Sequence, residues 1–206
     1  MELDTRRTPG EDPSLSAPPL GDVSRNARFL VRILKSRMIY DGRVVKLRVD
    51  RVIEPGGIEA TREVVCHPGS VVVLPLLPGG RVLLVRQFRY AAGRHLWELV
   101  AGGLEPGESV LRAARRELLE EAGYRARRVR RLFSFFPSPG IVNERMHLVE
   151  ASGLLLGKAQ PEADERIEVG IFTLPEVRTM LRRHRIEDGK TLVGLSWLLM
   201  SKRGSI

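Results

Sequence analysis

The 206-residue sequence contains one cysteine, few aromatic residues and no long apolar run. The single cysteine, Cys66, excludes an internal disulfide and fits a reducing cytosol. No stretch of about 18 apolar residues is present, so the sequence predicts no membrane-spanning helix. Residues 1–22 also lack the apolar segment of a secretory signal. These absences predict a cytoplasmic protein without a membrane partner.

Acidic residues are scarce relative to basic ones: 25 Asp and Glu stand against 34 Lys and Arg, a formal net charge of +9. A basic surface can bind nucleic acid, or it can attract a small polyanionic substrate. The densest basic cluster, residues 125–131, would place Arg125, Arg127 and Arg131 on one face of a strand. Aromatic residues make up 5% of the chain and none interleave with this cluster, which argues against stacking of single-stranded nucleic acid. We therefore expect a small anionic substrate and no nucleic-acid partner.

The composition divides the chain into three parts. Residues 1–27 are rich in Pro, Ser and Gly and show no apolar periodicity, which predicts a flexible N-terminal arm. Residues 28–66 are expected to form an N-terminal antiparallel β-hairpin subdomain. Residues 67–206 are expected to form one α/β or α+β domain.

The expected hairpin depends on an alternating pattern. Val45, Leu47 and Val49 alternate with charged residues, which predicts a strand over 43–53 with one apolar face. The turn "EPGG" follows, and the segment 58–67 returns as the antiparallel partner.

The third part alternates strand and helix patterns. The segments 70–77 and 81–88 are nearly all apolar and predict a second hairpin, buried in the core. A helix is expected over 109–122, with Ser109 as its N-cap and Gly123 as its stop. Further strands are expected at 96–100, 129–136, 145–151 and 166–174, and further helices at 174–185 and 190–202, the second capped by Asp188. These elements predict a mixed sheet with helices on its faces.

The predicted helix over 109–122 gathers three glutamates beside its apolar face. At about 100° per residue, the apolar sector contains Leu111, Ala114, Leu118 and Ala122, and the arc beside it contains Glu117, Glu120 and Glu121. Glu117 and Glu121 are four residues apart, so their carboxylates converge and repel each other. A divalent cation would compensate the repulsion, and oxygen ligands with no His or Cys nearby favour Mg²⁺ or Mn²⁺ over zinc. From these residues alone, a solvated helix face and a metal site for phosphoryl transfer both stay open.

The wider spacing decides between the two. Gly102 is followed after five residues by Glu108, and after seven more by Arg116-Glu117-Leu118-x-Glu120-Glu121-x-Gly123-Tyr124. Seven fixed residue types and two apolar positions match the Nudix box, and chance would give this match at about one start position in 10⁸. The chain therefore resembles the Nudix hydrolases, which cleave nucleoside diphosphates linked to another moiety. The resemblance implies the Nudix fold, a mixed β-sheet sandwiched between helices.

The flanks of the box resemble the ADP-ribose pyrophosphatase branch of the family. They read "RQFRYAAGRHLWELVAGGLEPGES" and "FPSPGIVNERMHLVEA", and Pro139 lies sixteen residues beyond Gly123 as in that branch. The segment "PEADERIEV", residues 161–169, resembles its acidic loop. The resemblance covers about residues 38–200. It implies a metal-dependent pyrophosphohydrolase that cleaves ADP-ribose to AMP and ribose 5-phosphate.

Two alternatives accompany this interpretation. Within the same class, the substrate would be a GDP-sugar or another nucleotide-sugar. In a different class, the chain would be a non-catalytic Nudix module that binds a nucleotide or RNA. Such modules tend to have lost box glutamates, whereas all of them are present in this sequence.

The resemblance also assigns roles to residues of the box. Glu117 and Glu121 are the expected ligands of Mg²⁺ or Mn²⁺, and Glu120 and the backbone carbonyl of Ala101 are further ligands. Three residues are expected to give structural support: Gly102, Glu108 and Arg116.

The remaining roles fall outside the box. Arg62 and Arg89 align with arginines that contact phosphate or substrate in the branch, and Pro139 marks a substrate-binding loop. Glu98, beside Trp97, is a candidate to bind the nucleoside, and a strand glutamate paired to a basic neighbour is an equal alternative. The general base is expected among four acidic residues: Glu165, Glu162, Asp164 and Glu144.

The resemblance finally implies a homodimer. In this branch the N-terminal hairpin commonly packs across a dimer. Arg62 would then reach the site of the neighbouring subunit.

Overall fold

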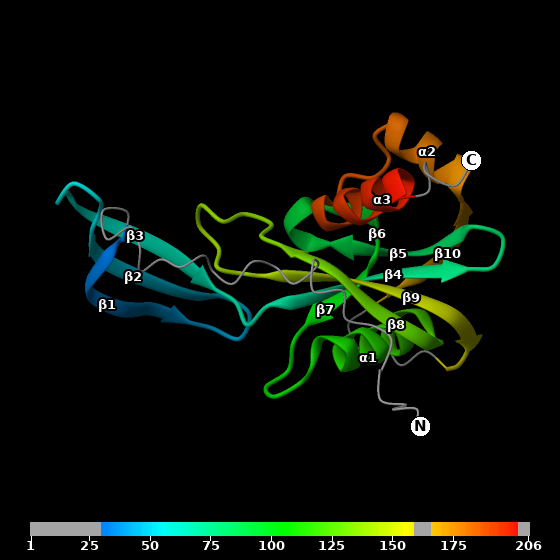
Figure 1. Ribbon diagram of the computed structural model, residues 1–206, viewed down its shortest axis with the longest axis horizontal. Helices are drawn as coiled ribbons and strands as arrows, with labels where there is room; N and C mark the ends of the chain where they lie inside the picture. The colour runs from blue at the N-terminus through cyan, green and yellow to red at the C-terminus, as the bar shows by residue number, and fades with distance from the viewer. Residues whose placement is uncertain (1–29, 159–165, 202–206) are drawn as a thin grey trace, which may run out of the picture.

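The computed structural model describes residues 30–158 and 166–201. The expected arm, residues 1–27, lies outside these ranges, and so do Glu162, Asp164 and Glu165. The described chain contains two β-sheets. Figure 1 shows the smaller sheet extending from one end of a larger body, which consists of the second sheet and the helices.

The smaller sheet has three antiparallel strands in the order β1-β2-β3. Their bounds are β1 Arg32–Asp41, β2 Lys46–Ile53 and β3 Glu59–Cys66. The expected hairpin is thus present as β2 and β3, whereas the sequence predicts no strand where β1 lies. β1 pairs with β2 through two register shifts, and all ten of its residues are exposed. Irregular pairing and exposure on both faces remove the alternating pattern that would have indicated a strand.

The buried face of β2 is not its apolar face. Asp50 and Val52 are 4% and 3% exposed, whereas Val45, just before the strand, is 45% exposed. Asp50 tolerates burial because Ser36 Oγ donates to its Oδ1 at 2.6 Å and Arg48 Nε donates to its Oδ2 at 3.0 Å. Paired polar groups therefore occupy the side that alternation alone assigns to solvent.

The larger sheet has seven strands and is mixed. Its main path is β10-β5-β4-β9-β8, while β6 pairs with β5 and β7 pairs with β4. The bounds are β4 Ser70–Leu77, β5 Arg81–Arg89, β6 Arg94–Glu98, β7 Val100–Gly103, β8 Tyr124–Phe135, β9 Met146–Leu156 and β10 Glu168–Thr173. β4 and β9 are parallel, and the other pairs are antiparallel. The segment 96–100, expected as one strand, is divided because the chain leaves β5 at Glu98 and joins β4 at Val100.

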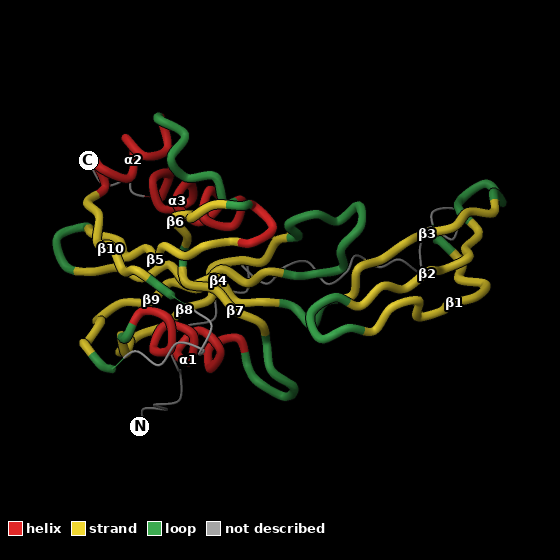
Figure 2. Tube along the Cα trace, turned by 180° about the vertical axis from the view of Figure 1, so that it is seen from behind, coloured by secondary structure: helices red, strands yellow, loops and turns green. Residues whose placement is uncertain are grey.

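Three helices cover the larger sheet close to where the sequence places them. α1 spans Val110–Ala122, α2 spans Leu174–Arg182 and α3 spans Gly189–Ser201. Figures 1 and 2 show α1 on one face of the sheet and α2 and α3 on the other. This arrangement confirms the expected fold, a mixed sheet between helices. No helix in the described ranges is long and apolar enough to cross a membrane.

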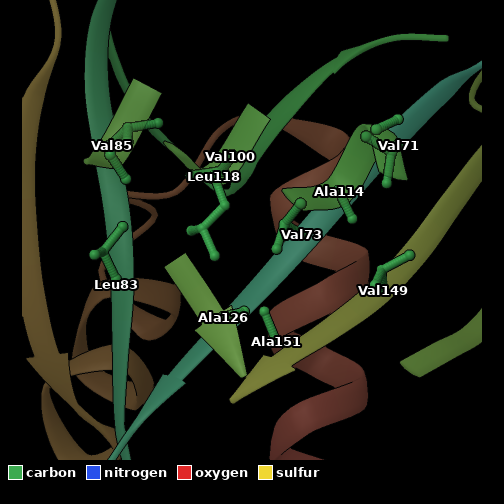
Figure 3. Close-up of a cluster of buried hydrophobic side chains, with 12 residues drawn as sticks. Val71, Val73, Leu83, Val85, Val100, Ala114, Leu118, Ala126, Val149 and Ala151 are labelled. Carbon is green, nitrogen blue, oxygen red and sulfur yellow. The ribbon is translucent and has the colours of Figure 1, made fainter. Parts of the chain in front are cut away.

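Alternation along the central strands supplies two cores. Val71 and Val73 of β4 belong to one cluster with Leu118 of α1 and Val149 of β9, and Figure 3 shows these side chains together. Val72 of the same strand belongs to the opposite cluster, under α2 and α3. The nearly continuous apolar sequence of β4 and β5 follows from coverage of both faces of the sheet.

Candidate active site

The box helix α1 buries two carboxylates. Its contact stripe with the sheet contains Ala113, Ala114, Leu118 and Ala122. Glu117 and Glu121 lie in the same stripe and are 8% and 6% exposed, whereas Leu111 is 40% exposed. The apolar sector expected to include Leu111 is therefore rotated towards the glutamates. Burying like charges one turn apart is costly unless donors or a cation compensate them, so a solvated helix face does not describe this helix.

Local signals fix the ends of α1. The Ser109 side chain accepts a hydrogen bond from the Arg112 amide as the N-cap. Gly123 ends the helix in the left-handed region, at φ 71°. Both agree with the sequence prediction, so residues at its two ends set the bounds of α1.

Strand β7 brings bare backbone against the carboxylate of Glu117. A Cβ built at Gly102 would lie 1.9 Å from Glu117 Oε1 and 2.5 Å from Oε2. A Cβ at the next residue, Gly103, would meet nothing within 4 Å. Glycine at position 102 therefore makes room for the carboxylate, one residue after Ala101.

Arg116 joins α1 to the box loop, residues 104–109 between β7 and α1. Its Nε and Nη2 donate to the two carboxylate oxygens of Glu108 at 3.1 and 2.9 Å. Its Nη1 donates to Glu117 Oε1 at 2.7 Å and to Glu120 Oε2 at 3.0 Å. Its Nη2 also donates to the Gly103 carbonyl at 3.0 Å. The hydrogen bond from Arg116 holds the pKa of the Glu108 carboxyl below its ordinary value, and the hydrogen bond to Glu108 is the main cause that raises the pKa of Arg116.

A second ionic cluster joins β5, β6 and α3. Arg89 donates from Nε and Nη2 to the two oxygens of Glu98, both at 2.7 Å. Glu98 is 1% exposed, and Lys190 Nζ donates to its Oε2 at 2.5 Å. The hydrogen bond to Glu98 is the main cause that raises the pKa of Arg89, and the charge of Glu121 on α1 adds to it. The cluster therefore lies within electrostatic reach of the box helix.

Glu144 lies at the same end of the larger sheet as the box loop. Ser70 Oγ donates to Glu144 Oε1 at 2.6 Å, and His67 Nδ1 lies 3.4 Å from the same oxygen. Ser70 is the backbone partner of Gly103 in β7. Pro139 is exposed in the loop between β8 and β9.

Arg62 is not brought to the box within one chain. Its Nη2 pairs with Glu54 Oε1 at 2.7 Å, and its Nη1 donates to the Thr61 carbonyl at 3.1 Å. Figure 1 shows its strand, β3, in the smaller sheet and apart from α1. Glu162 and Glu165, the other distant candidates, lie outside the described residues.

Sequence reasoning missed Lys190, Ser70 and His67. Lys190 meets Glu98 across 92 residues of chain, and Ser70 meets Glu144 across 74. No local motif joins these positions, so only the folded arrangement could reveal the contacts.

The oxygen donors around Glu117 suit a hard divalent cation. Across residues 30–158 and 166–201, no three His, Cys, Asp or Glu side chains are grouped as a ready metal site. Mg²⁺ takes few protein carboxylates and completes its shell with water and phosphate oxygens. Glu117 and Glu121 are buried one turn apart, and Glu117 lies against the backbone at Gly102, one residue after Ala101, so these residues fit such an ion.

Comparison with known proteins identifies the class. The NUDIX domain family matches residues 67–193, and the nucleoside diphosphate sugar hydrolase N-terminal domain matches residues 31–65. The chain belongs to the Nudix family, whose hydrolases need a divalent metal ion. The expected family and the expected enzyme class, a Nudix hydrolase, are confirmed.

Individual relatives are similar over most of their length. The ADP-ribose pyrophosphatase of Bacillus subtilis (strain 168) is 34% identical over 173 residues, 83% of this chain and 94% of that protein. The ADP-ribose pyrophosphatase of Mycobacterium tuberculosis (strain ATCC 25618 / H37Rv) is 33% identical over 165 residues, 79% of this chain and 80% of that protein. The methanol dehydrogenase activator of Bacillus methanolicus is 36% identical over 176 residues, 84% of this chain and 95% of that protein.

A solved structure shares the fold. The crystal structure of an ADP compounds hydrolase superposes with a TM-score of 0.76 at 20% identity. The match covers 84% of this chain and 95% of the other.

Proposed function

We propose that this protein is a metal-dependent pyrophosphohydrolase that cleaves ADP-ribose to AMP and ribose 5-phosphate. The observation that carries the proposal is the box helix, which buries Glu117 and Glu121 one turn apart against the glycine backbone of β7. Two relatives named ADP-ribose pyrophosphatase, each matching most of this chain, support the substrate. The single cysteine, Cys66, fits a cytoplasmic enzyme.

Residues of α1 and β7 would hold the metal ion. Glu117 and Glu121 are the proposed ligands, with Glu120 and the Ala101 carbonyl as further ones. Mg²⁺ is the proposed ion and Mn²⁺ the alternative, because both accept oxygen donors. When bound, such an ion neutralises charge on the diphosphate and makes water more acidic. Arg116 orients Glu117 and Glu120 through its hydrogen bonds.

The reaction adds water across the P–O–P linkage. The water oxygen bonds to one phosphorus, the bridging oxygen leaves with the other phosphate, and a carboxylate accepts the water proton. Glu165 is the first proposed base, with Glu162 beside it, and Glu144 is the alternative in the described chain. Arg89 is proposed to grip the diphosphate, and Pro139 to shape the substrate loop.

We further propose that the protein acts as a homodimer through residues 28–66. β1 is an edge strand with all ten residues exposed. Large apolar side chains such as Ile33, Tyr40 and Val44 are 60%, 59% and 72% exposed. Apolar surface of this extent favours burial by a partner. In that assembly Arg62 would contact the diphosphate in the neighbouring subunit's site.

A substrate panel tests the function. ADP-ribose, GDP-sugars and other nucleotide-sugars are incubated with the enzyme and Mg²⁺, and phosphate is measured after treatment with a phosphatase. We expect the highest kcat/KM for ADP-ribose. A higher kcat/KM for a GDP-sugar would show that the GDP-sugar, and not ADP-ribose, is the preferred substrate. Binding without turnover of any compound would indicate a non-catalytic module.

A further inference from the structure

Lys190 is an ammonium group held between two carboxylates. Its Nζ donates to Glu98 Oε2 at 2.5 Å and to Asp188 Oδ1 at 2.9 Å. The Lys190 side chain is 10% exposed and that of Glu98 is 1% exposed. Enclosing a lysine in this way is costly, because the ammonium group loses its hydration unless its partners compensate the loss.

Lys190 is itself fixed to the centre of the fold. The second oxygen of Asp188 accepts hydrogen bonds from the Thr191 amide at 3.0 Å and from Thr191 Oγ1 at 2.5 Å. Thr191 Oγ1 in turn accepts a hydrogen bond from the amide of Leu99 at 2.8 Å, and Thr191 is fully buried. The start of α3 is thereby tied to the junction between β6 and β7, two residues before Ala101.

Arg89 stands at the other end of this chain of contacts. Glu98 holds the Nε and Nη2 edge of its guanidinium, and the Arg89 side chain is 40% exposed. Within residues 30–158 and 166–201, Nη1 has no hydrogen-bond acceptor. One edge of the guanidinium is thus held by protein while the other can meet a ligand.

The same geometry favours the second of the two expectations for Glu98, a strand glutamate paired to basic neighbours. Both of its oxygens are bonded to protein cations, and the residue is buried. A buried carboxylate that accepts three hydrogen bonds from protein cations orients those partners.

We propose that Lys190 is a positioning residue: through Glu98 it fixes the guanidinium of Arg89 in the orientation that binds the diphosphate of the substrate. The inference rests on the proposed function, in which Arg89 grips that diphosphate. Without Lys190, Glu98 has Arg89 as its one cationic partner, and the pair can move together. Arg89 is then no longer held in one orientation before the substrate binds, so its contact with the substrate costs more conformational entropy.

The test separates substrate affinity from turnover. Lys190→Met is compared with the unchanged enzyme in Mg²⁺-dependent hydrolysis of ADP-ribose. We expect KM to rise about tenfold, equivalent to about 1.4 kcal/mol, and kcat to stay within about twofold because ground-state binding is lost. Calorimetry of ADP-ribose binding to Glu121→Gln, with and without Lys190→Met, should show the same loss of affinity without turnover.

A matched control removes a neighbouring ion pair. Arg94 of β6 pairs with Glu187 just before α3, so this pair joins the same two elements without reaching Glu98. Arg94→Met should leave KM unchanged. Lys190→Arg keeps the charge and should recover most of the affinity.

The pH profile supplies a readout that a purely structural role would not move. Burial raises the pKa of the Glu98 carboxyl, and hydrogen bonds and charge from Arg89 and Lys190 outweigh it, so the pKa lies below its ordinary value. Lys190→Met removes the part of this lowering of the pKa that Lys190 causes, whereas burial still raises the pKa of Glu98. The acid limb of kcat/KM should therefore move to higher pH in Lys190→Met, since protonated Glu98 no longer anchors Arg89. Lys190 and Arg89 face Glu98 directly, Asp188 acts on it through Lys190, and Glu121 acts on Arg89.

The outcomes separate this inference from the proposed function. A Lys190→Met enzyme with unchanged KM and unchanged pH profile, or an Arg94→Met enzyme with the same rise in KM, overturns the positioning role. A wild-type enzyme that leaves ADP-ribose intact overturns the proposed substrate instead. The Lys190 comparison is then made with whichever nucleoside diphosphate compound of the panel is cleaved.

Discussion

Buried carboxylates, some of them paired with cations, characterise the candidate site at the scale of single residues. Among the described residues, the buried acidic side chains are Asp50, Glu98, Glu117 and Glu121. Arg116 donates a hydrogen bond to Glu117, and both Arg89 and Lys190 donate to Glu98. Such groups cost desolvation energy. Three of the four, Glu98, Glu117 and Glu121, lie on β6 and α1. This concentration is typical of functional sites.

Replacing one proposed ligand tests the metal site. Glu121→Gln removes a charge while keeping the shape of the side chain, so the fold should persist. We expect kcat to fall at least about a hundredfold, the scale of losing transition-state electrostatic stabilisation. Steady-state rates at saturating Mg²⁺ and a melting curve measure the two effects. Glu187→Gln, an exposed glutamate, is the control, and near-normal turnover by a folded Glu121→Gln enzyme would remove Glu121 from the ligands.

Adjacent glycines give a matched pair of variants. The Cβ of Gly102→Ala would overlap the Glu117 carboxylate, whereas the Cβ of Gly103→Ala would enter open space. The end of a flexible side chain can move, so Gly102→Ala should fold and displace the carboxylate. We expect the Mg²⁺ concentration for half-maximal rate to rise about tenfold or more in Gly102→Ala and to stay nearly constant in Gly103→Ala. Equal metal titrations for the two variants would contradict the proposed place of Glu117.

The base is tested in the acidic loop first. Glu165→Gln should lower kcat and leave metal affinity nearly intact, because the base accepts a proton without holding the ion. The rate of the triple alanine variant of Glu162, Asp164 and Glu165 is the deciding measurement. If this variant keeps the normal rate, Glu144, which Ser70 and His67 contact, becomes the leading candidate.

At the scale of elements, a helix or strand could be predicted where its own segment of the sequence carries the pattern that determines it. α1 was predictable because Ser109, Gly123 and the box lie within one segment of chain. β4 was predictable because both its faces are covered, which leaves a continuous apolar run. β1 was not, because its apolar residues follow no period of two and its register shifts twice against β2.

The same reasoning applies to the candidate site. Glu117, Glu120 and Glu121 belong to one motif and could be named from the sequence. Lys190 could not, because the fold alone brings it to Glu98 from 92 residues away. The rotation of the buried stripe of α1 towards the glutamates was also hidden, since helical geometry gives relative angles and not the direction of the sheet.

The junction of the box loop and α1 gives a prediction about pH and stability. At this junction, the hydrogen bond that Arg116 donates to Glu108 lowers the pKa of the Glu108 carboxyl below the ordinary value of 4.5. This contribution to the free energy of unfolding is complete above the unfolded pKa and is lost as pH falls through the folded pKa. Urea unfolding should therefore show Glu108→Gln to be less stable than the wild type at neutral pH, with the difference shrinking below about pH 4. A difference that stays constant across this range would show that the charge of Glu108 does not contribute.

At the scale of the whole molecule, the smaller sheet leaves apolar surface uncovered. Its edge strand β1 exposes every residue, and the exposed apolar side chains continue through Val44, Val45 and Ile58. A three-stranded sheet with this surface is stabilised by a second layer. The larger body already covers both faces of its own sheet with helices. A second copy of the chain is the proposed layer, and Arg62 on β3 would then approach its box.

Hybrid dimers test this arrangement. If the guanidinium of Arg62 enters the partner's site, Arg62→Ala removes a charge-assisted contact worth roughly 1.5 to 3 kcal/mol, so kcat/KM should fall about ten- to a hundredfold. Arg62→Ala subunits are then mixed with an excess of Glu121→Gln subunits under conditions of subunit exchange. Each hybrid contains one site with both defects and one site with neither, so activity should reappear. A chain that sediments as a monomer, or a mixture that stays as slow as its parents after proven exchange, would show that Arg62 does not act across an interface.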